Sequence, residues 1–321
     1  MAEPRIVVTA PIPPAAERLL AELGEVVVSA GELRHEVADA EVLVVRGERV
    51  DAALIAAAPR LRVIARTGSG VDNVDVAAAT ARGIPVVNAP VAGAQPVAEG
   101  VWALIAAAAK RLGELRACIE QERWRDRYAL AGRDLDGSTL GIVGFGAIGA
   151  AVARIGAAFG MRVLAADPAF APPRDGTPVE AVTLPALVER ADVITLHCPL
   201  TASTRGLVDR DLLRRTQRAP ILVNAARGAV VAGDELLLEA LERGWLSAVA
   251  LDVFAHEPLP PTSGLLRDPR VICTPHSIGL TDGWNERVFA SLRHDVGELL
   301  AGGLPRHLVN PRALAGTVAA R

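Results

Sequence analysis

The stretch TLGIVGFGAIG, residues 139–149, decides the fold of this chain. It reads as a short apolar strand, a G-x-G-x-x-G turn and the start of an alanine-rich helix, and a second strand follows at residues 162–166. Gly144 permits a tight turn, Gly146 lets backbone N–H groups approach a pyrophosphate, and Gly149 allows the helix to pack closely on the strand. A pyrophosphate would then lie at the helix N-terminus, where free N–H groups favour an anion.

Asp167 follows the second strand directly. In a dinucleotide-binding βαβ unit, an acidic residue at this place accepts hydrogen bonds from the ribose hydroxyls. Its charge would repel a 2′-phosphate, so the sequence predicts NAD rather than NADP. A glycine pattern alone is also compatible with a purely structural turn. The strand, helix, second strand and acidic residue together favour the nucleotide site.

Composition narrows the class of protein. The chain has 321 residues, which predicts two domains of ordinary size. Hydrophobic residues make up 51% and charged residues 22%, as in globular proteins. The net charge is −3 without a basic block, which argues against nucleic-acid binding. The longest apolar run, residues 101–109, is too short to span a bilayer, and the N-terminus lacks a signal-peptide pattern. We therefore expect a cytoplasmic protein without a membrane partner.

The three cysteines are Cys118, Cys198 and Cys273, which lie far apart in the sequence. Their spacing indicates neither a disulfide framework nor a metal site. No metal is therefore expected.

Strands and helices alternate along the chain. In the first hundred residues we expect strands at 6–9, 26–28, 42–45, 62–65 and 85–87, with helices between them, for instance at 13–23 and 74–82. One long helix is expected at 96–122. Later strands are expected at 193–196, 221–223, 248–251 and 271–273, and a final helix at 282–301. This alternation is typical of parallel sheets with crossover helices.

The predicted fold class is therefore α/β, with two doubly wound parallel-sheet domains and the active site in a cleft between them. One is a Rossmann nucleotide domain and the other a flavodoxin-like substrate domain. The tail at 305–311 is expected to return to the first unit. The predicted domains are thus 1–98 with 288–321, which bind substrate, and 99–287, which bind NAD.

Three loops that follow strands carry candidate catalytic residues: Arg227 in VNAARG (223–228), Glu257 in ALDVFAHEP (250–258) and His276 in CTPHS (273–277). Ligands bind at such strand ends in doubly wound sheets. An arginine can bind a carboxylate through two hydrogen bonds, and a histidine can take a hydroxyl proton as hydride leaves. A nearby carboxylate orients the ring and favours its charged form. The combination predicts reversible oxidation of a 2-hydroxy acid.

Less specific interpretations stay open for these residues. Arg227 is also compatible with a surface arginine after a strand, and His256 is a rival to His276. His256 lies beside Glu257 in the same loop, and we expect it to be a solvated neighbour.

Five motifs occur in order: GFGAIG, LHCPLT, NAARG, ALDVFxxEP and TPH. With them the chain resembles the D-isomer-specific 2-hydroxyacid dehydrogenases, from about Ile6 to Pro311. The segment RTGSGVDNVD, residues 66–75, is similar to the phosphoglycerate-dehydrogenase-like branch of that family. The resemblance implies an NAD-dependent oxidoreductase acting on a D-2-hydroxy acid or 2-keto acid, such as 3-phosphoglycerate, glyoxylate or hydroxypyruvate.

The resemblance also implies roles for residues. Arg227 would bind the substrate carboxylate and carbonyl, and His276, paired with Glu257, would be the acid and base. Asp252 would hold the nicotinamide carboxamide. The other implied cofactor contacts are Gly144, Gly146, Ala147, Ile148, Gly149, Asp167, Cys198, Pro199, Thr204, Ala225, Ala226 and Gly279.

The first domain is expected to bind an anionic substrate. The backbone of Gly68, Ser69 and Gly70 would touch the substrate carboxylate by resemblance. Arg46 and Arg66 each follow an expected strand and point to an anion, although Arg46 is also compatible with a strand-end cap.

Members of the family commonly form dimers, so a homodimer is expected. Arg125 and Arg127 follow the long helix, in a region that reaches toward the partner subunit in the family. A solvated charged turn is the alternative for these two arginines.

Two segments depart from the family pattern. In residues 91–100, Gly100 stands where histidine is common. After His276, the sequence Ser277-Ile278-Gly279 replaces the commoner I-G-G or L-G-A. Because of these two departures, the sequence does not determine which 2-hydroxy acid is the substrate.

Other functions are compatible with the same motifs. An NAD-sensing binding protein, similar to the C-terminal binding protein corepressors, would keep these residues without relying on turnover. A phosphite or phosphonate dehydrogenase would also use arginine, glutamate and histidine. Formate dehydrogenases usually pair the histidine with glutamine, so Glu257 argues against that activity.

Overall fold

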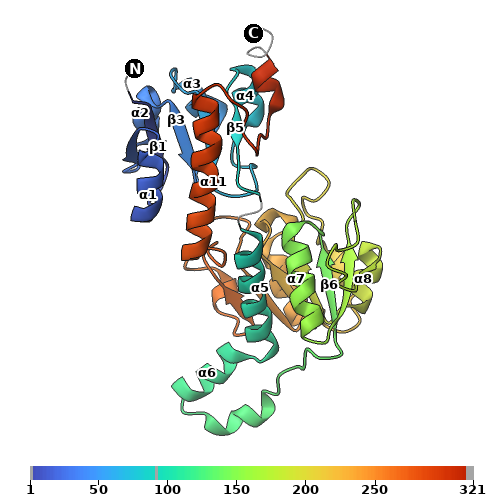
Figure 1. Ribbon diagram of the computed structural model, residues 1–321. Coiled ribbons are helices and arrows are strands. Elements are labelled where there is room, and N and C mark those ends of the chain that lie inside the picture. The colour runs from blue at the N-terminus through green and yellow to red at the C-terminus, as the bar shows by residue number, and fades with distance from the viewer. Residues whose placement is uncertain (1–2, 91–92, 316–321) are drawn as a thin grey trace. The chain divides into compact units, whose positions relative to one another are not determined.

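The computed structural model describes residues 3–90 and 93–315. The chain divides into two compact units, 1–93 with 280–321 and 94–279 (Figure 1). The predicted domain boundaries at 98/99 and 287/288 stay a prediction, and the ends of the predicted first domain lie partly outside the described residues. Val91 and Ala92, in the first departing segment, lie outside them as well. No helix in the described ranges combines the length and apolar character that a bilayer crossing requires.

The first unit is built on a five-stranded parallel sheet in the order β2-β1-β3-β4-β5. Side chains alternate along each strand, so Ile6 and Val8 of β1 pack into one core while Val7 packs into another. Because both faces are covered, the strands are almost wholly apolar. The strands are β1 (Arg5–Val8), β2 (Glu25–Val28), β3 (Val42–Val45), β4 (Val63–Arg66) and β5 (Val86–Val87), and the helices are α1 (Pro14–Ala21), α2 (Leu33–Glu36), α3 (Ala52–Ala56), α4 (Val76–Ala81) and α11 (Asp282–Leu300).

The second unit holds a seven-stranded parallel sheet in the order β12-β11-β10-β9-β6-β7-β8. The chain runs outward from β6 in both directions, so the switch point of the sheet lies between β6 and β9, where ligands bind in such folds. The strands are β6 (Thr139–Val143), β7 (Arg162–Ala166), β8 (Glu180–Ala181), β9 (Val193–Leu196), β10 (Ile221–Asn224), β11 (Ala248–Leu251) and β12 (Val271–Cys273). The helices are α5 (Ala94–Ala109), α6 (Leu112–Glu120), α7 (Ala147–Ala158), α8 (Leu184–Arg190), α9 (Arg210–Leu213) and α10 (Asp234–Glu242). Two parallel-sheet α/β units are confirmed.

The single long helix predicted at 96–122 is wrong. The chain forms α5 and α6 instead, with a break at Arg111, whose φ of 53° is left-handed. Helix α5 buries residues along most of its length, whereas α6 buries only Cys118 among its residues. The Arg111 guanidinium forms two hydrogen bonds with Glu114, at 2.7 and 2.6 Å. The helix thus ends at a left-handed arginine, where the buried stretch of α5 stops, and the nearby Gly113 lies inside α6 rather than at the break.

The tail lies against the first unit, as expected. The Val309 N–H donates to the Val86 carbonyl at 2.8 Å, so the tail extends the edge of the sheet at β5. The buried Asn310 side chain accepts a hydrogen bond from the Val86 N–H and donates to the Ile84 carbonyl and Thr80 hydroxyl. This polar side chain therefore satisfies the backbone where the tail returns.

Candidate active site

The turn after β6 leaves room for an anion. Gly144 has a φ of 90°, and a Cβ there would lie 2.4 Å from the Cys198 backbone nitrogen. A Cβ at Gly149 would lie 2.5 Å from the Gly144 carbonyl oxygen. A Cβ at Gly146, by contrast, would meet nothing within 4 Å, and Gly146 caps α7 without a side chain. The open space before a helix N-terminus fits a pyrophosphate.

Asp167 is held beside this turn. Its Oδ2 accepts the Phe145 N–H at 2.6 Å, and its Oδ1 accepts the Ala169 N–H at 2.7 Å. A carboxylate has about four acceptor sites, so both oxygens keep capacity for further donors. This arrangement fits a ribose diol, and NAD is therefore compatible with the residues of the turn.

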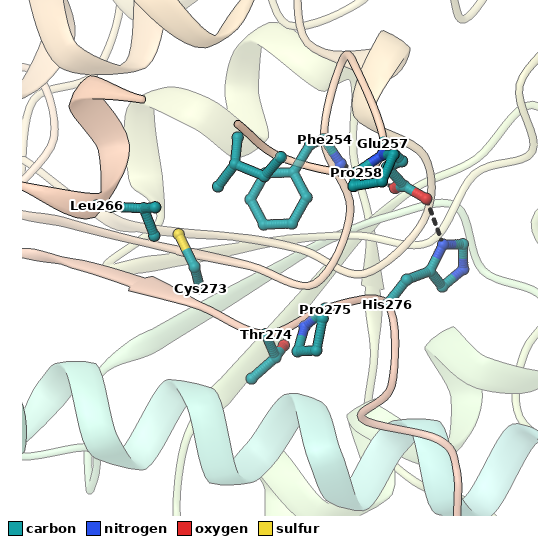
Figure 2. Close-up of a pocket in the computed structure, with 9 residues that line it drawn as sticks. Phe254, Glu257, Pro258, Leu266, Cys273, Thr274, Pro275 and His276 are labelled. Atoms are coloured by element: carbon teal, nitrogen blue, oxygen red, sulfur yellow. Dashed lines mark hydrogen bonds and ion pairs between the residues drawn. The ribbon is translucent and has the colours of Figure 1, made fainter. Parts of the chain in front are cut away.

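His276 and Glu257 form a hydrogen-bonded pair. The distance from His276 Nδ1 to Glu257 Oε2 is 2.8 Å, and Figure 2 shows the imidazole ring directed at this carboxylate. The Phe254 N–H donates to the other oxygen, Oε1, at 3.0 Å. With Nδ1 engaged, a hydrogen bond from the ring to a substrate would be made by its other nitrogen, Nε2.

The Glu257 carboxyl group is ionised at neutral pH. Burial opposes its ionisation, but the hydrogen bond and charge of His276, the Phe254 N–H and the charge of Arg227 together lower the pKa of Glu257. A lowered pKa in the folded state contributes stability above the ordinary carboxyl pKa. That stability is lost as the pH falls through the lowered value.

Asp252 anchors the loop that carries His276. Its buried Oδ1 accepts hydrogen bonds from the Thr274 hydroxyl at 2.7 Å, the Ser277 N–H at 2.8 Å and the Ile278 N–H at 3.3 Å. Burial raises the pKa of Asp252, and these hydrogen bonds oppose the rise. His276 itself has a left-handed φ of 53°. Asp252 therefore shapes the loop, a role separate from the cofactor contact implied by resemblance.

Arg227 lies in a turn that packs closely against the loop carrying Glu257. The Asn224 side chain closes the turn, because it donates to the Arg227 carbonyl and accepts the Ala226 N–H. A Cβ at Gly228 would lie 1.9 Å from the carbonyl carbon and oxygen of Phe254. Strands β10, β11 and β12 are neighbours, so their carboxyl ends place Arg227, Glu257 and His276 in one region of the second unit.

A cavity of about 550 Å³ opens beside the His276–Glu257 pair (Figure 2). This volume is typical of small-molecule sites. Burial raises the pKa of the Cys273 thiol in its wall to about 11, so the thiol is neutral. The lining is mostly apolar: Phe254, Glu257, Pro258, Leu259, Leu266, Cys273, Thr274, Pro275 and His276.

In the first unit, Arg46 directly follows β3, whereas Arg66 is the last residue of the neighbouring strand β4, and the two side chains have different surroundings. Arg66 donates to Asn73 Oδ1 at 3.2 Å and the Thr67 hydroxyl at 3.3 Å, and a Cβ at Gly68 would lie 2.8 Å from its Nη1. The Arg66 side chain thus covers the Gly68 backbone.

Arg46 is half-buried and has a different set of neighbours. Its Nη1 donates to the Pro11 carbonyl at 3.2 Å, and its guanidinium lies 5.8 Å from the Trp284 ring centroid. Burial lowers the pKa of Arg46, and Glu48 opposes this effect. Within the described ranges, Arg46 forms no ion pair with a carboxylate. A half-buried cation of this kind is suited to an anionic ligand.

Comparison with known sequences identifies the family. Residues 102–277 match the sequence model of the D-isomer specific 2-hydroxyacid dehydrogenase NAD binding domain. The chain belongs to the D-isomer specific 2-hydroxyacid dehydrogenase family. It therefore carries this family's NAD-binding domain.

Individual relatives agree with the family. The chain is 40% identical over 314 residues to a D-3-phosphoglycerate dehydrogenase of Methanocaldococcus jannaschii, covering 95% of this chain and 59% of the relative. The chain thus spans little more than half the length of that relative. It is 38% identical to a hydroxypyruvate reductase of Thermotoga maritima, over 86% of this chain and 92% of that protein. The structure is similar to Aquifex aeolicus D-lactate dehydrogenase complexed with NAD and lactic acid, with a TM-score of 0.85, 27% identity and coverage of 95% and 98%.

Other residues implied by this dehydrogenase resemblance lie at strand ends of the second unit. Cys198 follows β9 and faces Gly144 across the switch point. The Thr204 hydroxyl donates a hydrogen bond to the Pro199 carbonyl oxygen, which closes the loop between these two residues. Ala225 and Ala226 occupy the turn before Arg227, and Ala226 is buried. Their contacts with NAD stay a prediction.

The sequence patterns did not single out three residues that shape this candidate site: Asn224, Gly228 and Thr274. Each lies inside a quoted motif, within two residues of a candidate site residue. Their roles depend on contacts with distant segments, as in the bond from Thr274 to Asp252. Arg125 is exposed and Arg127 is partly buried in a 3₁₀ turn, Trp124–Ala129, and their contribution to a partner stays a prediction.

Replacing Gly144 with alanine is expected to weaken NADH binding by about tenfold or more and to lower the thermal unfolding midpoint. A Cβ would clash with the Cys198 backbone, and the left-handed φ is strained for any side chain. NADH fluorescence titration and thermal unfolding measure the two effects. Gly176→Ala is the matched control, because it has a similar φ of 74° and open space. Equal NADH affinity in both variants would contradict the assignment of this turn.

Proposed function

We propose that the protein is an NAD-dependent D-2-hydroxyacid dehydrogenase that interconverts a D-2-hydroxy acid and its 2-keto acid. The observation that carries this proposal is the His276–Glu257 pair at 2.8 Å, with Arg227 held beside it. A proton carrier and an anion-binding group in one region are what this reaction requires. Family membership supplies independent support.

The residues divide the chemistry of keto-acid reduction. When bound, NADH supplies the hydride. Arg227 binds the carboxylate of the keto acid and polarises its carbonyl group. His276 donates the Nε2 proton to the carbonyl oxygen, and Glu257 stabilises the imidazolium before that transfer. In oxidation His276 takes the hydroxyl proton back.

The cofactor would be held by both the glycine turn and the neighbouring strand ends. The turn and the α7 N-terminus would bind the pyrophosphate, Asp167 would bind the ribose hydroxyls, and Asp252 would hold the nicotinamide carboxamide. We assign the remaining contacts to Gly144, Gly146, Ala147, Ile148, Gly149, Cys198, Pro199, Thr204, Ala225, Ala226 and Gly279. The open space at Gly146 supports this assignment.

The substrate is a small anion. We assign its binding in the first unit to Arg46, Arg66 and the backbone of Gly68, Ser69 and Gly70. Half-buried Arg46, stacked near Trp284, supports a substrate with negative charge. Glyoxylate, hydroxypyruvate, its phosphate and 3-phosphoglycerate are the candidates.

A substrate panel tests the proposed activity. NADH oxidation is followed with glyoxylate, hydroxypyruvate, phosphohydroxypyruvate, pyruvate and phosphonopyruvate, and NAD reduction with 3-phosphoglycerate and phosphite. Turnover of one or more 2-keto acids supports the proposal. Tight NADH binding without turnover of any compound would contradict it and favour a sensing role, and turnover of phosphite alone would favour the phosphite reaction.

Asp167→Ser is expected to shift cofactor preference toward NADPH by about tenfold to a hundredfold, because one unit of charge near the 2′-phosphate is worth about 1–3 kcal/mol. The ratio of kcat/KM for NADH and NADPH measures the shift. Asp167 also accepts two backbone N–H groups, so Asp167→Asn is the control that keeps an acceptor there without the charge. An unchanged ratio in both variants would contradict the proposal that the charge of Asp167 disfavours NADPH.

We further propose that the protein is a homodimer. The region after α5 exposes Leu112 (54%), Ile119 (63%), Trp124 (61%) and Tyr128 (78%). Large apolar side chains gathered on one segment often mark an interface. Sedimentation velocity on the wild type and on Ile119→Ser/Trp124→Ser tests this, and a wild-type monomer at micromolar concentration would refute it.

A further inference from the structure

The two segments that depart from the family pattern meet in the second unit. Gly100 lies in α5, and Ile278 lies in the loop after β12. A Cβ at Gly100 would lie 2.6 Å from the Ile278 Cβ, 2.6 Å from its carbonyl oxygen and 3.1 Å from its carbonyl carbon. Two of these atoms are backbone, so no side chain fits at position 100 unless the loop moves.

The contact extends over one helical turn. A Cβ at Gly279 would lie 2.7 Å from the Val97 side chain, and Val97 and Gly100 are three residues apart in α5. Residues at this spacing share one face of a helix. Residues 278 and 279 therefore rest on a single face of α5. Figure 2 shows the chain after His276 descending toward the teal helix, which has the colour of α5 in Figure 1.

The same loop is tied on its other side to Asp252. The Ser277 and Ile278 N–H groups both donate to its buried Oδ1. His276, one residue earlier, keeps a left-handed φ of 53°, which a residue with a side chain adopts only where its surroundings impose it. Asp252 and the face of α5 both hold the residues that directly follow His276.

We propose that Gly100 is a positioning residue for the reaction. Because Gly100 has no side chain, Ile278 packs directly on α5. The loop, packed in this way, holds His276 in the backbone conformation that directs Nδ1 to Glu257. The inference rests on the proposed role of His276.

Gly100→Ala is expected to lower kcat by tenfold or more, because the added Cβ displaces the loop and with it the His276–Glu257 pair. The NADH dissociation constant should change by a smaller factor than kcat, because the assigned pyrophosphate contacts lie in the glycine turn after β6, a separate element, although Gly279 lies in the displaced loop. Gly113→Ala in α6 is the matched control: its Cβ would come no closer than 3.9 Å to a neighbour, and kcat should be unchanged.

Rescue separates positioning from a general structural role. Ile278→Gly removes one of the two close contacts and frees the loop, so Gly100→Ala/Ile278→Gly should recover at least threefold in kcat over Gly100→Ala alone. Wild-type kcat in Gly100→Ala would overturn the inference. So would a loss of kcat matched by an equal loss of NADH binding, or a double variant no better than the single. Absence of wild-type turnover on the substrate panel would instead refute the proposed function itself.

Discussion

Replacing His276 with asparagine is expected to lower kcat by about 10²- to 10⁴-fold, the range for removal of a general acid–base group. Asparagine keeps a hydrogen-bonding side chain at the left-handed position, where it is tolerated better than most residues. It cannot carry the proton to the carbonyl oxygen. NADH affinity, measured by fluorescence titration, should be nearly unchanged, because the cofactor residues lie mainly at other strand ends.

His256→Asn is the matched control for this experiment. His256 is exposed and lies next to Glu257 in sequence, but the Glu257 carboxylate bonds to His276. Wild-type kcat in the control and a collapse in His276→Asn would support the assignment. The reverse result would make His256 the proton carrier and disprove the role given to His276.

Glutamine at Arg227 is expected to lower kcat/KM for the keto acid by about 10²- to 10³-fold, equivalent to about 3–4 kcal/mol of lost charge-assisted binding. The loss should appear chiefly in KM for the acid if Arg227 binds the ground-state carboxylate, and also in kcat if it polarises the carbonyl. Arg227→Lys keeps the charge but loses the planar pair of donors, so it should recover only part of the loss. Steady-state kinetics at varied acid concentration separate the two contributions.

A surface arginine of the same unit provides the comparison for Arg227. Arg243 is exposed and pairs with Glu239 within α10 and its C-cap, so Arg243→Gln should leave kcat/KM within twofold of wild type, the usual scale for an exposed pair. Arg227 also contributes to the lowered pKa of Glu257. Rates are therefore compared at several pH values well above the ordinary carboxyl pKa. Unchanged kcat/KM in Arg227→Gln would exclude it from substrate binding.

Much of the fold was readable because it is encoded locally. The strand, glycine turn and helix of residues 139–158 are contiguous, and backbone geometry demands glycine at Gly144, where φ is 90°. Strands buried on both faces appear as short apolar runs, so their predicted bounds agree with the structure to within about two residues. Strand ends then locate the loops with Arg227, Glu257 and His276, since parallel strands share a carboxyl edge.

Tertiary contacts decided the rest. The helix break falls at Arg111, where the buried stretch of α5 stops, and not at the glycine two residues later, Gly113, which is helical. The choice of His276 over His256 as the partner of Glu257 follows from a bond between loops nineteen residues apart. The Gly100 and Ile278 departures looked independent along the chain but occupy one space. Local patterns specify backbone conformation and burial, whereas pairing between distant residues depends on the volume and hydrogen-bonding groups that the folded units bring together.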